Sequence, residues 1–290
     1  MASKVPVITV YFWIIKVLTT AMGEATSDFL AHRFDPYLVV PFGGVAFCIV
    51  VGIQLSVRRY MTWIYWSAVV MVAIFGTMMA DSIHIALHVS YTVSTTAFAA
   101  ALAVIFIAWY ATERTLSIHS IYTRRREMFY WATVLATFAL GTAAGDLTAR
   151  TLGLGFLSAG VLFLVVIAIP AIAHWKLGMN SILAFWFAYV ITRPIGASFS
   201  DYFGLSHRYG GLGYGYGTVS LTLTVVIVLL VGYLAVTGKD VEERVASADA
   251  MGGRHRLGPA QGDMAPQPAR VPVADQVERC SERQPGRQDW

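Results

Sequence analysis

An aspartate recurs four times in this sequence at a fixed distance from a tryptophan. A glycine stands ten residues after each tryptophan and the aspartate fifteen residues after it, so the pattern W-x9-G-x4-D holds without a gap. The four aspartates are Asp28, Asp81, Asp146 and Asp201. Each lies near the end of a long apolar stretch, where an ionisable group is costly and is by default a functional candidate. Carboxylates brought together repel one another unless a cation, a proton or a basic partner compensates. The pattern therefore predicts a cation site.

The residues around the aspartates indicate which cation that would be. The position four residues earlier, on the same helical face, holds an oxygen ligand in three repeats, and a histidine follows Asp81 after three residues. Carboxylate and hydroxyl oxygens suit magnesium, manganese or calcium, whereas an imidazole shifts the preference toward transition metals. We therefore predict six metal ligands and two supporting polar residues: Asp28, Asp81, Asp146, Asp201, Glu24 and His84, with Thr77 and Thr142.

Two basic residues stand inside apolar stretches. Lys16 precedes Glu24 by eight residues, and Arg193 precedes Asp201 by eight. Either could neutralise a carboxylate as a tethered counter-ion that gives way to a substrate. Lys16 could instead extend its ammonium to the membrane interface. Because Arg193 shares a helix with Asp201, we expect Asp201 to contribute least to the site.

Composition places the chain in a membrane. Hydrophobic residues make up 57% of the 290 residues and charged residues 13%, whereas soluble proteins carry about 25% charged residues. Apolar runs of this length indicate transmembrane helices. A helix forms all its backbone hydrogen bonds within itself, whereas an open sheet would leave backbone groups unpaired in lipid. We predict an all-α membrane protein with eight transmembrane helices, near residues 7–30, 36–56, 62–88, 91–111, 127–152, 155–175, 181–204 and 214–236.

The helices group into four parallel two-helix repeats, because each copy of the pattern spans two apolar runs. The repeats cover about residues 8–60, 61–125, 126–179 and 180–237 within a transmembrane domain of residues 1–238. A small residue follows each repeat glycine by one turn, a pattern that lets helices approach closely in lipid. The odd-numbered helices are therefore predicted to be central, packed at Gly23, Gly76, Gly141 and Gly196. The tryptophans at the other end of these helices are predicted to anchor them in the membrane interface: Trp13, Trp66, Trp131 and Trp186.

Basic residues lie mainly in the loops after the even-numbered helices, which places both termini in the cytoplasm by the positive-inside rule. These short basic loops account for the positive charge without a nucleic-acid partner, and the expected partner is the lipid bilayer. Residues 239–290 are rich in Gly, Pro, Gln and charge, and we predict a disordered cytoplasmic tail. The two cysteines, one in an apolar run and one in this tail, predict neither a disulfide framework nor a metal site.

The sequence resembles a bacterial membrane-protein family of unknown function, built from four tandem two-helix repeats that are each marked by a tryptophan. The four W-x9-G-x4-D units carry the resemblance, together with residues 141–146 and 185–189, and it extends over about residues 8–236. The resemblance implies a polytopic protein of the bacterial inner membrane. It implies little about chemistry.

From the acidic repeats we predict a transporter of divalent metal cations, manganese-like in preference, with efflux as its direction and protons as the coupling ion. One alternative is a transporter or channel for another solute, in which the aspartates serve only proton coupling. Another is a membrane sensor or scaffold that acts through the basic tail. An enzyme is not expected, since no Ser-His-Asp spacing, H-E-x-x-H motif or phosphate loop is present. No covalent cofactor is expected, and the divalent cation enters as a substrate.

Overall fold

The computed structural model describes residues 3–241, apart from the side chains of residues 85–87. All the regular structure in this part of the chain is helical. The long helices are α1 (Val10–Arg33), α2 (Pro36–Ser56), α3 (Thr62–Leu87), α4 (Tyr91–Glu113), α5 (Arg124–Asp146), α6 (Phe156–Val166), α7 (Ala168–Leu177), α8 (Ser181–Gly204) and α9 (Tyr216–Thr237). Three short helical turns join them: η1 (Ile118–Ser120), η2 (Leu147–Thr151) and η3 (His207–Tyr209). The predicted tail begins within this range, but residues 242–290 lie outside the described part of the chain.

Local signals explain where the helices begin and end. Side chains of Thr9, Asp35 and Thr123 accept hydrogen bonds from the first amides of α1, α2 and α5, which otherwise lack partners. Gly178 and Gly238 end α7 and α9 in the left-handed conformation that glycine adopts without strain. The boundaries therefore follow from short-range chemistry and agree with the predicted spans within a few residues.

The described helices form an all-α membrane protein. Seven helical segments are long and apolar enough to cross a bilayer, with α6 and α7 forming one of them. The eighth predicted span, α1, has the required length of 24 residues but is less apolar, because it carries Lys16, Glu24 and Asp28. The predicted sixth helix is divided at Ile167, and Pro170 supplies the reason, since it has no amide to bond the carbonyl of Val166.

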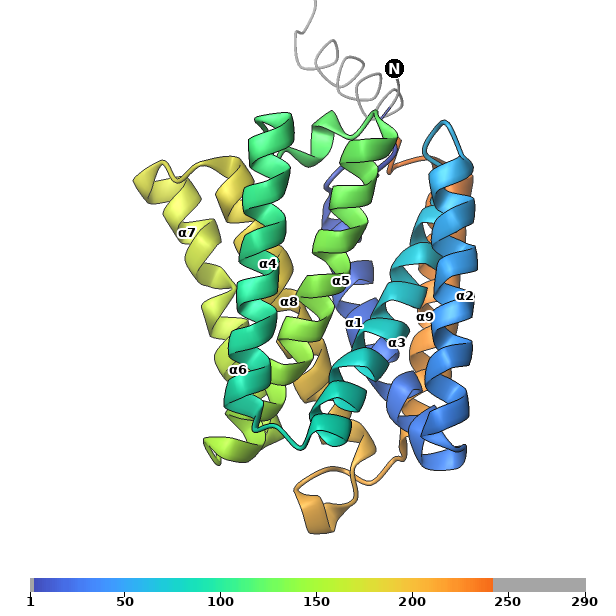
Figure 1. Cartoon of the computed structure of the whole chain (residues 1–290), viewed down its shortest axis with the longest axis vertical. Helices are drawn as coiled ribbons and strands as arrows, with labels where there is room; N and C mark the ends of the chain where they lie inside the picture. The colour runs from blue at the N-terminus through green and yellow to red at the C-terminus, as the bar shows by residue number, and fades with distance from the viewer. Residues whose placement is uncertain (1–2, 242–290) are drawn as a thin grey trace, which may run out of the picture. The chain divides into compact units, whose positions relative to one another are not determined.

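Helices α1, α3, α5 and α8 form a closed inner ring. Each packs against the next, and α8 packs against α1 (Figure 1). The other helices lie outside: α2 packs on α3, α4 on α5, α6 and α7 on α8, and α9 on α1. Within the most apolar stretches, 56% to 67% of the residues of α3, α5 and α8 are buried, against 17% to 28% in α2, α4, α6–α7 and α9. We predicted that the first, third, fifth and seventh spans would be central. These spans are α1, α3, α5 and α8, so the prediction is confirmed.

The repeat glycines lie at the four contacts of the inner ring. A methyl group on Gly76 would stand 2.8 Å from Cβ of Phe138. The corresponding group on each other glycine would also overlap a neighbour, on Gly23 with Ala73, on Gly141 with Arg193 and on Gly196 with Thr20. In every case the residue contacted is the seventh after the tryptophan of the adjacent repeat. The ring therefore repeats one helix contact four times, with a glycine on one side of each.

Three of the four repeat tryptophans are buried in the bundle, whereas we predicted that all four anchor the helices in the membrane interface. Trp66, Trp131 and Trp186 are only 2–4% exposed, and only Trp13 is half-buried. They point into the bundle and pack with the other aromatic rings of the main core. The indole of Trp186 also donates a hydrogen bond to the carbonyl of Leu116 at 2.9 Å. Inward packing is favourable here because each ring buries a large apolar area between neighbouring inner helices.

Candidate cation site

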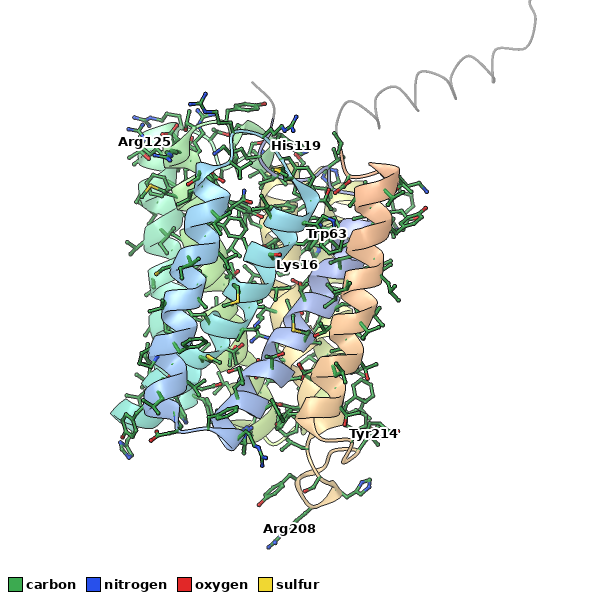
Figure 2. The ribbon with its side chains drawn as sticks, turned by 90° about the vertical axis from the view of Figure 1, so that its right-hand side faces the viewer. Lys16, Trp63, His119, Arg125, Arg208 and Tyr214 are labelled. Atoms are coloured by element: carbon green, nitrogen blue, oxygen red, sulfur yellow. The ribbon has the colours of Figure 1, made fainter. Side chains whose placement is uncertain are left out.

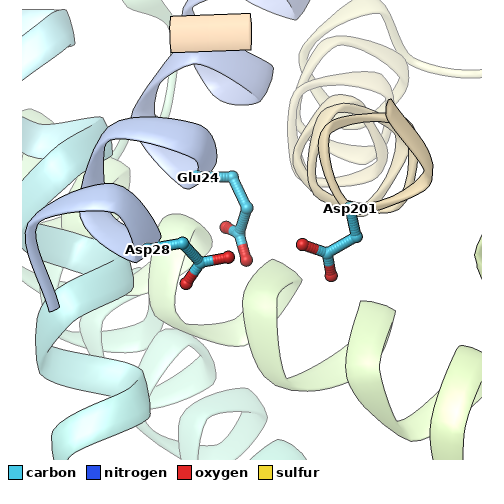
Figure 3. Close-up of side chains that lie close together, drawn as sticks. All are labelled: Glu24, Asp28 and Asp201. Carbon is cyan, nitrogen blue, oxygen red and sulfur yellow. The ribbon is translucent and has the colours of Figure 1, made fainter. Parts of the chain in front are cut away.

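Three carboxylates meet near the end of the ring opposite the aromatic core. Glu24 and Asp28 lie one turn apart on α1, and Asp201 faces them from α8 (Figure 3). One carboxylate oxygen from each lies within 4.8 Å of the other two. Glu24 and Asp201 are only 4% and 3% exposed, and Asp28 is half-buried. We call Glu24, Asp28 and Asp201 the carboxylate triad. Its all-oxygen composition suits a hard divalent cation.

The other two repeat aspartates lie near the triad but outside it. Asp146 accepts a hydrogen bond from Nε of Arg150 at 2.7 Å, across one turn where α5 continues into the wider π-helical turn η2. Both Asp81 and Asp146 are close enough to interact electrostatically with Glu24. The structure therefore gathers carboxylates from all four repeats into one region. It brings only those of the first and fourth repeats within reach of a single ion.

Arg193 joins the four inner helices above the triad. From α8, its Nη2 lies within hydrogen-bond distance of the carboxylate of Glu24 and of the hydroxyls of Thr77 and Thr142, the last at 2.8 Å, so its two hydrogens are shared among three acceptors. Its Nη1 donates to the carbonyl of Thr20 at 2.9 Å. The side chain is fully buried. Thr77 and Thr142, which we predicted as supporting oxygens for a metal, hold this guanidinium instead.

The expected order of importance among the aspartates does not follow from these contacts. We expected Asp201 to contribute least because Arg193 shares its helix. Arg193 pairs with Glu24 instead, since eight residues along a helix place the two groups about 12 Å apart along its axis. Asp201 lies in the triad, where it accepts a hydrogen bond from the hydroxyl of Tyr216 at 3.0 Å.

Lys16 is not the charge partner of a carboxylate. Its side chain is 1% exposed, so it does not reach the surface either. Nζ stands 3.9 Å from the ring centre of Phe138 and 4.1 Å from that of Tyr189, and it has no hydrogen-bond partner among the described residues. Contact with aromatic faces compensates a buried ammonium only in part. Lys16 is therefore an incompletely satisfied donor inside the ring.

His84 lies apart from the triad. Its ring stacks on that of Tyr91, with 3.9 Å between ring centres and 12° between planes. It is not one of the side chains that converge with Glu24, Asp28 and Asp201 within the described residues. The predicted ligation by His84 alongside the triad is therefore not seen, because His84 stands nearly a full turn beyond Asp81 toward the end of α3.

Sequence reasoning missed Arg150 and Tyr216, and it did not identify the partners of Arg193. The spacing of four residues between Asp146 and Arg150 was a readable signal, because such pairs meet on a helix. The alignment of repeats also singles out Arg193, which replaces Thr20, Ala73 and Phe138 of the other repeats. Tyr216 follows a glycine-rich loop, and nothing in its spacing indicates a contact with Asp201.

The fold and the site together define a polytopic all-α membrane protein that closes four two-helix repeats around a buried acidic centre. Four consecutive matches to one family model correspond to these repeats, over residues 11–60, 64–115, 129–179 and 184–240. The chain belongs to this family, which is described as Repeat of Unknown Function (DUF347). Neither the curated proteins nor the solved structures contain a match to the chain.

Proposed function

We propose that the protein transports a divalent metal cation, manganese-like in preference, across the bacterial inner membrane, with efflux as its direction and protons as the coupling ion. The observation that supports this most is the carboxylate triad, whose three oxygens lie within 4.8 Å of one another in a region of largely buried side chains. Oxygens about 2.0–2.6 Å from one ion would be separated by no more than about 5 Å, so the triad needs little rearrangement.

Arg193 supplies the counter-charge when no cation is bound. Three adjacent carboxylates repel, and the ion pair between Arg193 and Glu24 reduces that repulsion. A divalent cation at Asp28 and Asp201 would attract Glu24 and compete with Arg193 for it. Binding would then loosen the one side chain that contacts all four inner helices. This exchange offers a physical link between cation binding and a change of the inner ring.

Metal flux into proteoliposomes tests the proposal. The purified protein is reconstituted with a metal-sensitive dye inside, and Mn²⁺ is added outside. We expect Asp28→Asn and Asp201→Asn to abolish the flux while the protein remains folded. Asp35→Asn is the matched control, because Asp35 caps α2 outside the triad and Asn caps a helix as well as Asp. Flux that persists in both triad variants would refute the proposal, as would the absence of any metal flux in the wild type.

We also propose that both termini face the cytoplasm. Arg125 and His119 lie at the end of the bundle where α1 begins, and Arg208 lies at the other end (Figure 2). Single cysteines at positions 58 and 208, introduced after Cys48 and Cys280 are replaced by serine, test this arrangement. A membrane-impermeant thiol reagent added to whole cells, or to spheroplasts, should label position 208 and leave position 58 unlabelled. Labelling of both positions, or of position 58 alone, would contradict the topology.

A second candidate is a carrier of another solute, in which the carboxylates serve only to move protons. Lys16 favours it, because a buried amine that has no hydrogen-bond partner within residues 3–241 can serve an anionic or proton-coupled solute. Proton flux that depends on Asp201 but not on any divalent metal would favour this carrier. Proton flux that requires Mn²⁺ would favour the metal transporter.

A further inference from the structure

A basic hollow opens at the end of the bundle where the inner helices begin. Its volume is about 540 Å³, and its wall comes from the N-terminal segment, the turn after α2 and the start of α5. The charged residues that line it are Lys4, Arg58 and Arg124, with Tyr122 beside them. No carboxylate is among the described residues that line this hollow, so the charges they present there are all positive.

The charge of Lys4 is already balanced within the protein. Its Nζ forms an ion pair with Glu127 at 2.6 Å, and Gln54 donates to the other oxygen of that carboxylate at 3.0 Å. Arg58 and Arg124 differ from it. Both residues are exposed, and neither guanidinium has a hydrogen bond or an ion pair with the described residues. Two uncompensated cations therefore flank one hollow.

The two arginines that follow Arg124 differ from it, because each has an ion-pair partner. Arg125 and Arg126 both pair with Glu113, at 2.5 and 2.7 Å. Arg124 is the first residue of α5, and the capping side chain of Thr123 accepts from the amide of Arg126. The amides of Arg124 and Arg125, in the first turn of α5, lack intrahelical acceptors and add partial positive charge at the hollow. An anion is the ligand that complements these groups.

An apolar hollow lies farther along the same face of α2. Its volume is about 530 Å³, and it is lined by Pro41 and Cys48 of α2 and by Phe75 of α3. Leu55 lines the basic hollow and follows Cys48 by seven residues, or about two helical turns, so the two hollows lie about 10 Å apart along one face. Helix α2 is mostly unburied, which leaves this face open to lipid. A basic hollow followed by an apolar one matches an amphiphile with an anionic head and a long hydrocarbon chain.

We propose that an anionic phospholipid binds here, with its headgroup between Arg58 and Arg124 and an acyl chain along α2 toward Cys48. Basic pockets between transmembrane helices at the positively charged side of a membrane bind such headgroups. The site is separate from the carboxylate triad. The inference therefore does not depend on the proposed transport function.

Lipid retention by the purified full-length protein tests the inference. The protein in mild detergent is mixed with phosphatidylglycerol or with phosphatidylcholine of the same acyl chains, and bound lipid is measured by native mass spectrometry. Arg58→Gln with Arg124→Gln should weaken phosphatidylglycerol binding about thirtyfold, since each basic residue near an anionic headgroup contributes about a factor of five. Arg59→Gln with Arg114→Gln is the matched control. It removes two exposed arginines that do not line the hollow, and it should change binding less than twofold.

Two further measurements separate the phospholipid from other anions. Cys48→Trp fills the apolar hollow without a change of charge, and it should weaken binding of the long-chain lipid. Inorganic phosphate at millimolar concentration should not displace phosphatidylglycerol. Equal losses in the two double variants, equal retention of phosphatidylcholine, or displacement by free phosphate would each overturn the inference.

Discussion

Replacement of Gly141 by alanine should reverse the usual effect of that substitution in a helix. Alanine in place of glycine ordinarily stabilises a helix by about 1 kcal/mol. At Gly141, however, the added methyl group would overlap Cβ and Cγ of Arg193 and lie 3.0 Å from Cδ of Pro194. Overpacking of a tight contact costs about 1–3 kcal/mol. Because the helical preference offsets part of this cost, the net loss of stability should be up to about 2 kcal/mol, which lowers Tm by up to about 8 °C for a chain of this size.

Two glycines provide controls for this prediction. One turn farther along α5, a methyl group on Gly145 would meet only ordinary contacts, the nearest at 3.7 Å from Cβ of Ala197. On α2, a methyl group on Gly52 would meet nothing within 4 Å. Gly145→Ala and Gly52→Ala should therefore leave Tm unchanged or raise it by a few degrees, since the helical preference for alanine is unopposed.

Thermal unfolding in detergent, followed by tryptophan fluorescence, measures all three variants at one scan rate. Three of the repeat tryptophans are useful reporters because their indoles are buried in the bundle. A Tm for Gly141→Ala equal to or above that of Gly52→Ala would refute the tight contact between α5 and α8. It would also contradict the close packing of the Arg193 side chain against Gly141.

Two other predictions concern the charged centre. Arg193→Gln should destabilise the protein by about 3–5 kcal/mol, because it leaves Glu24 buried without its ion-pair partner. In thermal unfolding, the added change Glu24→Gln should recover most of that loss, and a double variant no more stable than Arg193→Gln would contradict the pairing. Asp28→Asn and Asp201→Asn should each reduce Mn²⁺ affinity, measured by titration calorimetry, and their combination should fall far from the sum of the single effects because they share one ion; additive effects would argue for two independent sites.

The repeated spacing was sufficient to predict the inner ring, because each glycine marks a contact that the backbone geometry must make. The helix contact at each repeat glycine could be predicted without knowing its partner helix, because the property that matters there is the absence of a side chain. The partners of the buried charges could not be predicted in this way. Arg193 and Glu24 are 169 residues apart. The acidic residue nearest to Arg193 in sequence is Asp201, on the same helix, so proximity in sequence indicates the wrong partner. The inward direction of the tryptophans was missed for a related reason, since an amphipathic ring suits both a lipid interface and a helix contact.

Closure of the ring by α8 against α1 has a consequence for synthesis of the protein. Helix α1 leaves the ribosome first, yet its packing partners α8 and α9 and the arginine that neutralises Glu24 are made last. The insertion machinery must therefore hold a weakly hydrophobic, charged helix while most of the chain is translated. A truncated product that ends before α8 would expose Glu24 and Lys16 to lipid or to the insertion channel. Such fragments should be substrates for membrane quality-control proteases, and a nonsense mutation late in the gene should be as harmful as an early one.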